Sequence, residues 1–144
     1  MQKCSGSIRG MRTSNHAAFS LTYHVILTVK YRRRCINAAM LERLQDIFAK
    51  VCAAWRCELL ECSGEQDHVH LLIDVHPSMN LARMIGNVKT VSARLIRKEF
   101  GAHLAKYYWK AKFWNNAYAV VSAGGHASIE QLVAYIQDQD KPPA

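Results

Sequence analysis

Alternating apolar and polar residues mark two stretches of the chain as β-strands. In residues 19–31 and again in residues 67–75, nearly all odd-numbered positions are apolar or aromatic. Successive side chains of a strand point to opposite faces, so each stretch is expected to turn one face toward a core. In the second stretch, His68 and His70 share the opposite face.

Apolar residues at three-and-four spacing predict three helices. The first helix follows Asn37, and the second begins near Asn80, with Ser78 or Asn80 as its cap, and ends by Gly101. The third follows Ser128, which can cap it.

Residues 57–63 and 117–123 are expected to form two further strands, and a turn joins the first of them to the His68 strand. The predicted order is therefore β-α-β-β-α-β followed by a helix. This is the ferredoxin-like arrangement, an α+β fold with an antiparallel sheet, here with an added C-terminal helix. Because the helices of this fold cover one sheet face, we expect the histidine face to be open.

The chain has 144 residues, 50% of them hydrophobic, which suits one domain with its own core. We expect a flexible basic tail over residues 1–17 and a single domain over residues 18–144. No apolar run is long enough to span a bilayer or to act as a secretory signal. The five scattered cysteines lack a Cys-x-x-Cys pair, which favours a reducing cytoplasm over a zinc ribbon or a disulfide framework.

The formal net charge of +8 favours a polyanionic partner, although many small basic proteins bind nothing in particular. In residues 103–117 aromatic rings alternate with lysines, a pattern that suits stacking of unpaired bases or cover for the core edge. The candidate DNA contacts are Lys30, Arg32, Arg33, Lys89, Arg94, Lys106, Lys110 and Lys112.

Two pairs of residues could carry chemistry. His68 and His70 are separated along the strand by roughly 6.5–7 Å, which lets both imidazoles reach one divalent cation, unless they are simply polar surface residues. Tyr135 and Gln139 fall together on the flank of the last helix's apolar stripe. Tyr135 is thus either an amphipathic ring at the core boundary or a phenol displayed one turn from a carboxamide.

Together these features resemble the single-tyrosine HUH transposases of the IS200-like insertion sequences, over nearly everything from Tyr23 to Gln139. The motifs that carry the resemblance are Tyr23-His24, Lys30-Tyr31-Arg32-Arg33, Asp67-His68-Val69-His70-Leu71-Leu72, Lys89, Ser92, Phe113-Trp114, Ser122-Ala123-Gly124-Gly125 and Tyr135-Ile136-x-x-Gln139. The chain departs from the family at Gln66, where a proline is common, and at Ala119, which replaces an aromatic residue.

The resemblance implies a metal-dependent DNA strand transferase. His68, His70 and Gln139 would bind Mg²⁺ or Mn²⁺, and Tyr135 would attack a DNA phosphate to give a 5′-phosphotyrosine link and a free 3′-OH. The implied substrate is single-stranded DNA with subterminal hairpins. The implied assembly is a homodimer in which the tyrosine helix can complete the partner's site. The sequence identifies no general base.

Two alternatives stay open. The same basic ferredoxin-like fold would serve a non-catalytic regulator that binds single-stranded DNA or RNA. A nicking replication initiator or relaxase of the HUH type is the other alternative, which the short chain and Gln139 in place of a third histidine disfavour.

Overall fold

The structure of the chain, a computed structural model, describes residues 12–14, 17–19, 21–123 and 129–139. The strands are β1 (Arg12–Ser14), β2 (Ala17–Phe19), β3 (Thr22–Val29), β4 (Glu58–Gly64), β5 (His68–Asp74) and β6 (Trp114–Ser122). The helices are α1 (Ala38–Ala54), α2 (Leu81–Glu99), α3 (Gly101–Leu104) and α4 (Ile129–Gln139), and η1 (Lys30–Arg32) is a single 3-10 turn.

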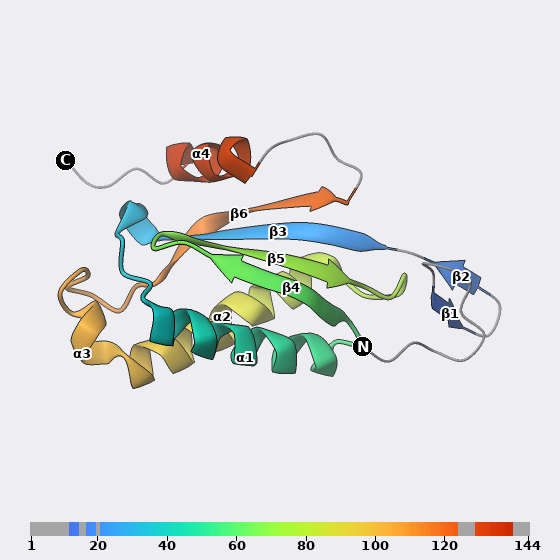
Figure 1. The fold of residues 1–144 in the computed structure, drawn as a ribbon, viewed down its shortest axis with the longest axis horizontal. Coiled ribbons are helices and arrows are strands. Elements are labelled where there is room, and N and C mark those ends of the chain that lie inside the picture. The colour runs from blue at the N-terminus through green and yellow to red at the C-terminus, as the bar shows by residue number, and fades with distance from the viewer. Residues whose placement is uncertain (1–11, 15–16, 20, 124–128, 140–144) are drawn as a thin grey trace.

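Four strands form one antiparallel sheet in the order β4-β5-β3-β6 (Figure 1). The short strands β1 and β2 pair separately. In the β3–β5 register, Thr28 lies opposite His68 and Ile26 lies opposite His70. The arrangement confirms the predicted ferredoxin-like α+β fold.

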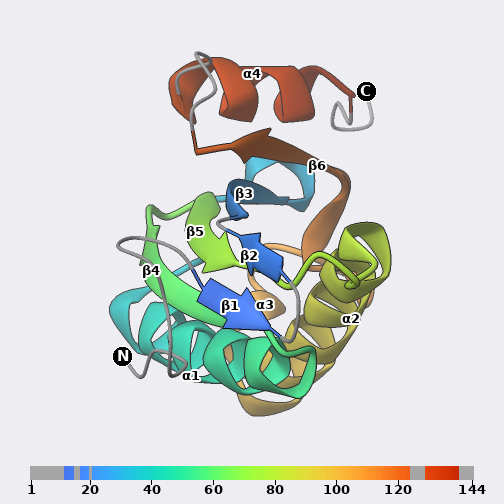
Figure 2. The ribbon, with the colours of Figure 1, turned by 90° about the vertical axis from the view of Figure 1, so that its right-hand side faces the viewer.

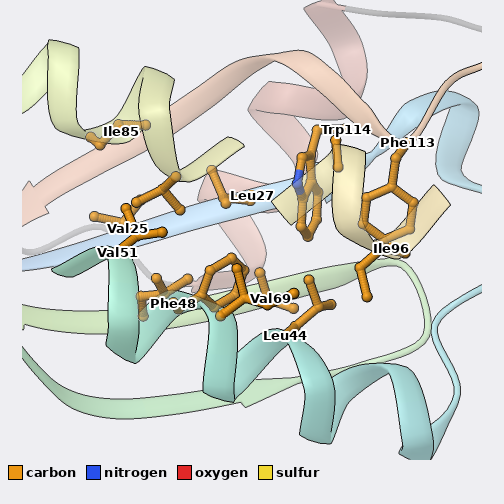
Figure 3. Packing of buried hydrophobic residues seen from close by; sticks show 14 of the residues in the cluster. Val25, Leu27, Leu44, Phe48, Val51, Val69, Ile85, Ile96, Phe113 and Trp114 are labelled. Carbon is orange, nitrogen blue, oxygen red and sulfur yellow. The ribbon is translucent and has the colours of Figure 1, made fainter. Parts of the chain in front are cut away.

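The main core lies between this sheet and the two long helices. Figure 2 shows α1 and α2 on one face of the sheet and α4 beyond the other. Val25 and Leu27 of β3 and Val69 of β5 are buried against Phe48 of α1 (Figure 3). Trp114 packs in the same core, with its ring centroid 6.4 Å from that of Phe48.

The sequence predicted that the opposite sheet face would be open. In the structure, α4 covers part of this face. Ile26, Ala119 and Ile136 form a small second cluster between β3, β6 and α4. Ile26 and Ile136 are fully buried. The prediction was wrong here because the apolar stripe of α4 needs a surface to pack on, and the sheet supplies it.

The first long helix begins after Asn37, and of the two caps expected for the second, Ser78 or Asn80, the structure has Asn80. Asn37 accepts a hydrogen bond from the backbone N–H of Met40 at 2.9 Å, and Asn80 accepts one from that of Arg83 at 3.1 Å. The predicted cap Ser128 lies outside the described residues. None of the helices that the structure describes has the combined length and apolar character that crossing a membrane requires.

Three boundaries differ from the sequence analysis. The first predicted strand ends at Val29, where η1 begins, and β6 starts at Trp114 rather than at residue 117. Residues 12–14 of the expected flexible tail form β1, while residues 1–11 lie outside the described part of the chain.

Candidate active site

His68 and His70 share one face of β5, as predicted, and both line a cleft of about 540 Å³. Val69 and Leu71, which alternate with them, are buried on the core side. The other side of the cleft belongs to α4. The cleft is lined by Arg32, Ser63, Gly64, Glu65, Asp67, His68, His70, Glu130, Val133, Ala134 and Gln137.

Asp67 orients the first histidine of the pair. Its Oδ1 lies 2.8 Å from Nδ1 of His68, and its Oδ2 accepts a long hydrogen bond of 3.5 Å from the side-chain amide of Gln137 on α4. A carboxylate that holds one imidazole nitrogen leaves the other nitrogen directed to a ligand, as in carboxylate–histidine metal sites. Nε2 of His68 is therefore the nitrogen available to an ion.

His70 pairs with a histidine from the neighbouring strand. Nδ1 of His24 lies 2.8 Å from Nε2 of His70, and the two rings stack with their centroids 5.0 Å apart. Burial lowers the pKa of His70 below its ordinary value, and the neighbouring His24 lowers it further. A neutral imidazole is the form that binds a metal. His70 offers either Nδ1 to an ion, or Nε2 once His24 has released it.

Thr28 places a buried polar atom next to the histidine pair. It lies opposite His68 in the β3–β5 register and is only 1% exposed, and its hydroxyl oxygen has no hydrogen-bond partner within the described residues. Buried hydroxyls are normally hydrogen-bonded, so this one suits a water or a ligand group bound beside His68. The oriented ring of His68, the neutral ring of His70 and this hydroxyl fit a site for a hydrated divalent cation.

A third ligand of the ion site is not among the acidic, histidine or cysteine side chains that the structure describes. Within the described residues, no three side chains of the His, Cys, Asp or Glu types gather in a geometry that could hold an ion. Gln139 closes α4, but its side chain lies outside the described part of the chain, so its role as third ligand stays a prediction.

Tyr135 lies away from the histidine pair of its own chain. It is 60% exposed and is absent from the cleft lining, whereas Ala134 and Gln137 of the same helix line the cleft. At 100° per residue, Tyr135 and Gln137 point about 160° apart around the helix axis. Within one chain, therefore, the structure brings together the two histidines but not the tyrosine.

The predicted DNA contacts fall into three groups. Arg32 lines the histidine cleft. Lys30, Arg33 and Lys112 surround the ring of Tyr31, and the ammonium of Lys110 lies over the ring of Trp109. Arg94 on α2 and Lys106 after α3 are exposed.

Lys89 differs from the other predicted contacts. Its ammonium donates hydrogen bonds to the carbonyl oxygens of Asn115 and Asn116, at 2.8 and 2.9 Å, and lies 5.5 Å from the ring centroid of Tyr118. Burial lowers its pKa, and the charge of Lys30 lowers it further. Lys89 thus joins α2 to the start of β6, a structural contact that the sequence analysis did not foresee.

Some residues that contact the histidine pair or its carboxylate received no role from the sequence: Asp67 and Gln137, which line the cleft, and His24, which contacts His70. The alternation in β3 places His24 on the histidine face, but its contact with His70 depends on the register between β3 and β5. Asp67 directly precedes His68 in the chain. Gln137 stands two residues from Tyr135, on the flank of α4 that faces the cleft.

A family model described as "Transposase IS200 like" matches residues 17–139. The protein therefore belongs to the IS200-like transposases, a family of DNA-acting enzymes that move insertion sequences.

Individual relatives agree with this assignment. The transposase for insertion sequence element IS200 of Salmonella typhimurium is 27% identical over 127 residues, 88% of this chain and 83% of the relative. The ISDra2 transposase TnpA of Deinococcus radiodurans is 26% identical over 129 residues, 90% of this chain and 91% of the relative.

Solved structures share the fold. A structure from Deinococcus radiodurans, assigned as a transposase, superposes with a TM-score of 0.77 at 27% identity, covering 92% of this chain and 100% of the other. A REP-associated tyrosine transposase bound to a REP hairpin superposes with a TM-score of 0.50 at 9% identity, covering 87% and 69% of the two chains.

Proposed function

We propose that the protein cleaves and rejoins single-stranded DNA at the ends of an insertion sequence through a covalent link to Tyr135. The observation that carries this proposal is the cleft in which the oriented His68–His70 pair faces α4, the helix that bears the exposed Tyr135. The IS200-like family supplies the class of reaction.

In the proposed step, the phenolic oxygen of Tyr135 attacks the scissile phosphorus. A new P–O bond to the tyrosine forms, the phosphorus–O3′ bond breaks, the phenol gives up its proton and the leaving oxygen takes up a proton. The products are a 5′-phosphotyrosine link and a free 3′-OH. Because one phosphate ester replaces another, a second 3′-OH can reverse the step and join a new strand without an external energy source.

An Mg²⁺ or Mn²⁺ ion, when bound, would supply Lewis-acid polarisation of the scissile phosphate. His68 and His70 would hold this ion, with Gln139 as the proposed third ligand. Asp67 keeps the His68 ring in a fixed tautomer. Arg32, which lines the same cleft, would contact a neighbouring phosphate.

We propose further that Tyr135 acts on the site of a partner subunit in a homodimer. The cleft-facing flank of α4 and the flank that bears Tyr135 point in different directions, so one helix can line its own cleft and present its phenol elsewhere. The proposed substrate carries a hairpin, as does the DNA bound to the REP-associated relative.

The nucleophile is tested with hairpin-bearing single-stranded DNA and Mn²⁺ on denaturing gels. The wild type should form a covalent protein–DNA adduct, EDTA should prevent it, and Tyr135→Phe should not form it. Tyr118→Phe removes a hydroxyl from a half-buried tyrosine outside the cleft and serves as the matched control. An adduct of wild-type yield in Tyr135→Phe would show that another group is the nucleophile.

A mixing experiment tests action across subunits. Tyr135→Phe lacks the phenol and a His68→Ala/His70→Ala double variant lacks the ion site, so each alone should be inactive. In a mixed dimer, the tyrosine of the double variant can meet the histidines of the other subunit. The adduct should then appear on the double variant only. Failure to restore the adduct in verified mixed dimers would place the complete site within one subunit.

A non-catalytic regulator that binds single-stranded nucleic acid is the second candidate function. The separation of Tyr135 from the histidine cleft within one chain favours it. Hairpin binding that persists in EDTA, without any adduct in Mg²⁺ or Mn²⁺, would support the regulator over the transferase.

A further inference from the structure

Four aromatic rings line a second hollow, of about 270 Å³: Tyr31, Tyr107, Tyr108 and Trp109. Trp109 is 90% exposed, the most exposed of the large hydrophobic side chains that the structure describes. Small-molecule clefts are usually about 300–1,000 Å³, so this hollow suits a single flat group rather than a larger ligand.

Cations lie over two of these rings, Trp109 and Tyr31. The ammonium of Lys110 lies 5.1 Å from the ring centroid of Trp109. Around Tyr31, the distances to the ring centroid are 5.4 Å for Lys30, 5.8 Å for Arg33 and 5.6 Å for Lys112. All are within the range of cation–π attraction.

Three of these cations, Arg33, Lys110 and Lys112, line the hollow, and no carboxylate is among its lining residues. Like charges gathered at one ring repel one another, and a bound anion relieves that repulsion. The hollow therefore combines faces for stacking with charges for phosphate.

The hollow and the histidine cleft meet at the turn η1. Arg32 lines the cleft, and its neighbours Tyr31 and Arg33 line the hollow. Tyr31 and Arg32 have φ values of 59° and 55°, in the left-handed region that residues with side chains rarely adopt. This backbone is what directs consecutive side chains into two different sites.

Neighbouring segments hold the turn in place. The buried phenol of Tyr108 donates a hydrogen bond of 2.6 Å to the carbonyl of Lys30, and the Lys30 N–H donates one of 2.7 Å to the carbonyl of Phe113. Burial raises the pKa of Tyr108, so this phenol remains a donor. The turn and the segment between α3 and β6 accordingly lie at the same end of the sheet (Figure 1).

We propose that this hollow, the Trp109 groove (Tyr31, Arg33, Tyr107, Tyr108, Trp109, Lys110 and Lys112), binds one unpaired base of the single-stranded DNA. The base stacks on Trp109, and Lys110 moves from the ring face to a flanking phosphate. Arg33 and Lys112 hold the next phosphate, and the strand continues past Arg32 into the histidine cleft. This inference rests on the proposed function and adds a base-binding position next to the reaction site.

The groove is tested by equilibrium binding of fluorescent single-stranded oligonucleotides in EDTA, where no cleavage occurs. Trp109→Ala should weaken binding roughly five-fold or more, since stacking of a base on an aromatic ring contributes on that scale. Trp109→Phe keeps a ring and should retain most of the affinity. Because Trp109 is exposed, these variants should keep the wild-type melting temperature, which is measured in parallel.

The phosphate contact is tested through salt dependence. The logarithm of the binding constant falls as the logarithm of the salt concentration rises. Lys110→Ala should make this negative slope less steep by about 0.7, the value for one phosphate contact on a single strand. Lys50→Ala removes an exposed charge from α1, outside the groove, and should leave the slope unchanged.

An abasic scan identifies the stacked base. One abasic position along the oligonucleotide should weaken binding to the wild type and have no further effect on Trp109→Ala. If Trp109→Ala binds as tightly as the wild type and shows the same abasic pattern, the groove binds no base and the inference fails. That result leaves the Tyr135 adduct test untouched. Conversely, the abasic scan can show a base position that depends on Trp109 while the protein forms no adduct. That result would support base binding in the Trp109 groove and refute the strand-transfer function.

Discussion

On one face of the sheet, α1 and α2 enclose a continuous apolar core. On the other face, α4 contacts the strands through Ile26, Ala119 and Ile136, beside a polar cleft. A single strand, β5, serves both faces: its Val69 and Leu71 belong to the core, and its His68 and His70 to the cleft. Alternation along β5 thus separates the residues that stabilise the fold from those proposed to act on DNA.

The difference in packing suggests different local stability. A helix held by few buried apolar contacts opens at lower free-energy cost than the core elements do. In the proposed reaction, α4 must place Tyr135 at a partner's site, so a weakly held helix on a rigid sheet suits that role. The following variants test the two faces, starting with the largest expected effect.

Phe48→Ala should have the largest effect, because it empties the centre of the core face. Phe48 is fully buried on α1 and packs against Trp114. Replacing such a ring by a methyl group lowers the free energy of unfolding by about 3–5 kcal/mol. Urea denaturation measures the loss. A change below about 1 kcal/mol would show that the core face is less tightly packed than the structure indicates.

Ile136→Ala should act mainly on the docking of α4. Its side chain is fully buried against Ile26 and Ala119. A loss of about 2 kcal/mol at this contact would speed hydrogen exchange of α4 amides roughly 30-fold, while β5 amides keep their protection. Mass spectrometry of hydrogen exchange resolves the two segments.

Tyr135→Phe is the control for α4 docking, since it changes only an exposed hydroxyl on the same helix. It should leave exchange in α4 unchanged. If Ile136→Ala instead accelerated exchange equally in α4 and β5, the two faces would unfold as one unit, and the proposed division between them would be wrong.

The core face was largely predictable from the sequence, because short-range patterns determine it. Alternation located β5, and three-and-four spacing located α1 and α2. Asn37 and Asn80 marked the helix starts, since their side chains can accept a hydrogen bond from the first turn. Each of these signals lies within a few residues of the element it predicts.

The cleft face depended on contacts between distant segments. The stacking of His24 on His70 requires the β3–β5 register, and a slip by two residues would keep every side chain on its face while separating the rings. The left-handed backbone at Tyr31 and Arg32 could not be predicted, because neither residue is a glycine, the residue that usually marks such a conformation. The placement of α4, and hence the direction of Tyr135, followed from packing on Ile26, which alternation alone assigned to an open face.

His24→Phe tests whether the second ring positions His70. Phenylalanine keeps a flat ring for stacking but removes the nitrogen that lies 2.8 Å from His70. Loss of a group that orients a ligand typically weakens metal binding about 10- to 100-fold. Titration with Mn²⁺ followed by electron paramagnetic resonance measures the affinity directly. His76→Gln, at a histidine absent from the cleft lining, should bind Mn²⁺ as the wild type does. Tighter binding by His24→Phe would mean that His24 competes with the ion for His70.

The smallest effect is expected in the pH dependence of the metal-free protein. Burial, and then the neighbouring His24, hold the pKa of His70 below its ordinary 6.5. Above that pH the ring is neutral in both the folded and the unfolded states, so it does not alter stability. As the pH falls below 6.5, the unfolded chain takes up the proton first, and the free energy of unfolding decreases until the folded ring is protonated too.

His70→Asn removes this proton-binding group and should therefore lose less stability than the wild type between neutral and mildly acidic pH. Urea denaturation on both sides of the ordinary histidine pKa, with EDTA present, gives the comparison. An unchanged slope in His70→Asn would show that the His70 ring accepts a proton as readily in the folded state as in the unfolded one. The His70 ring would then contribute nothing to acid sensitivity, and packing would remain as the difference between the two faces.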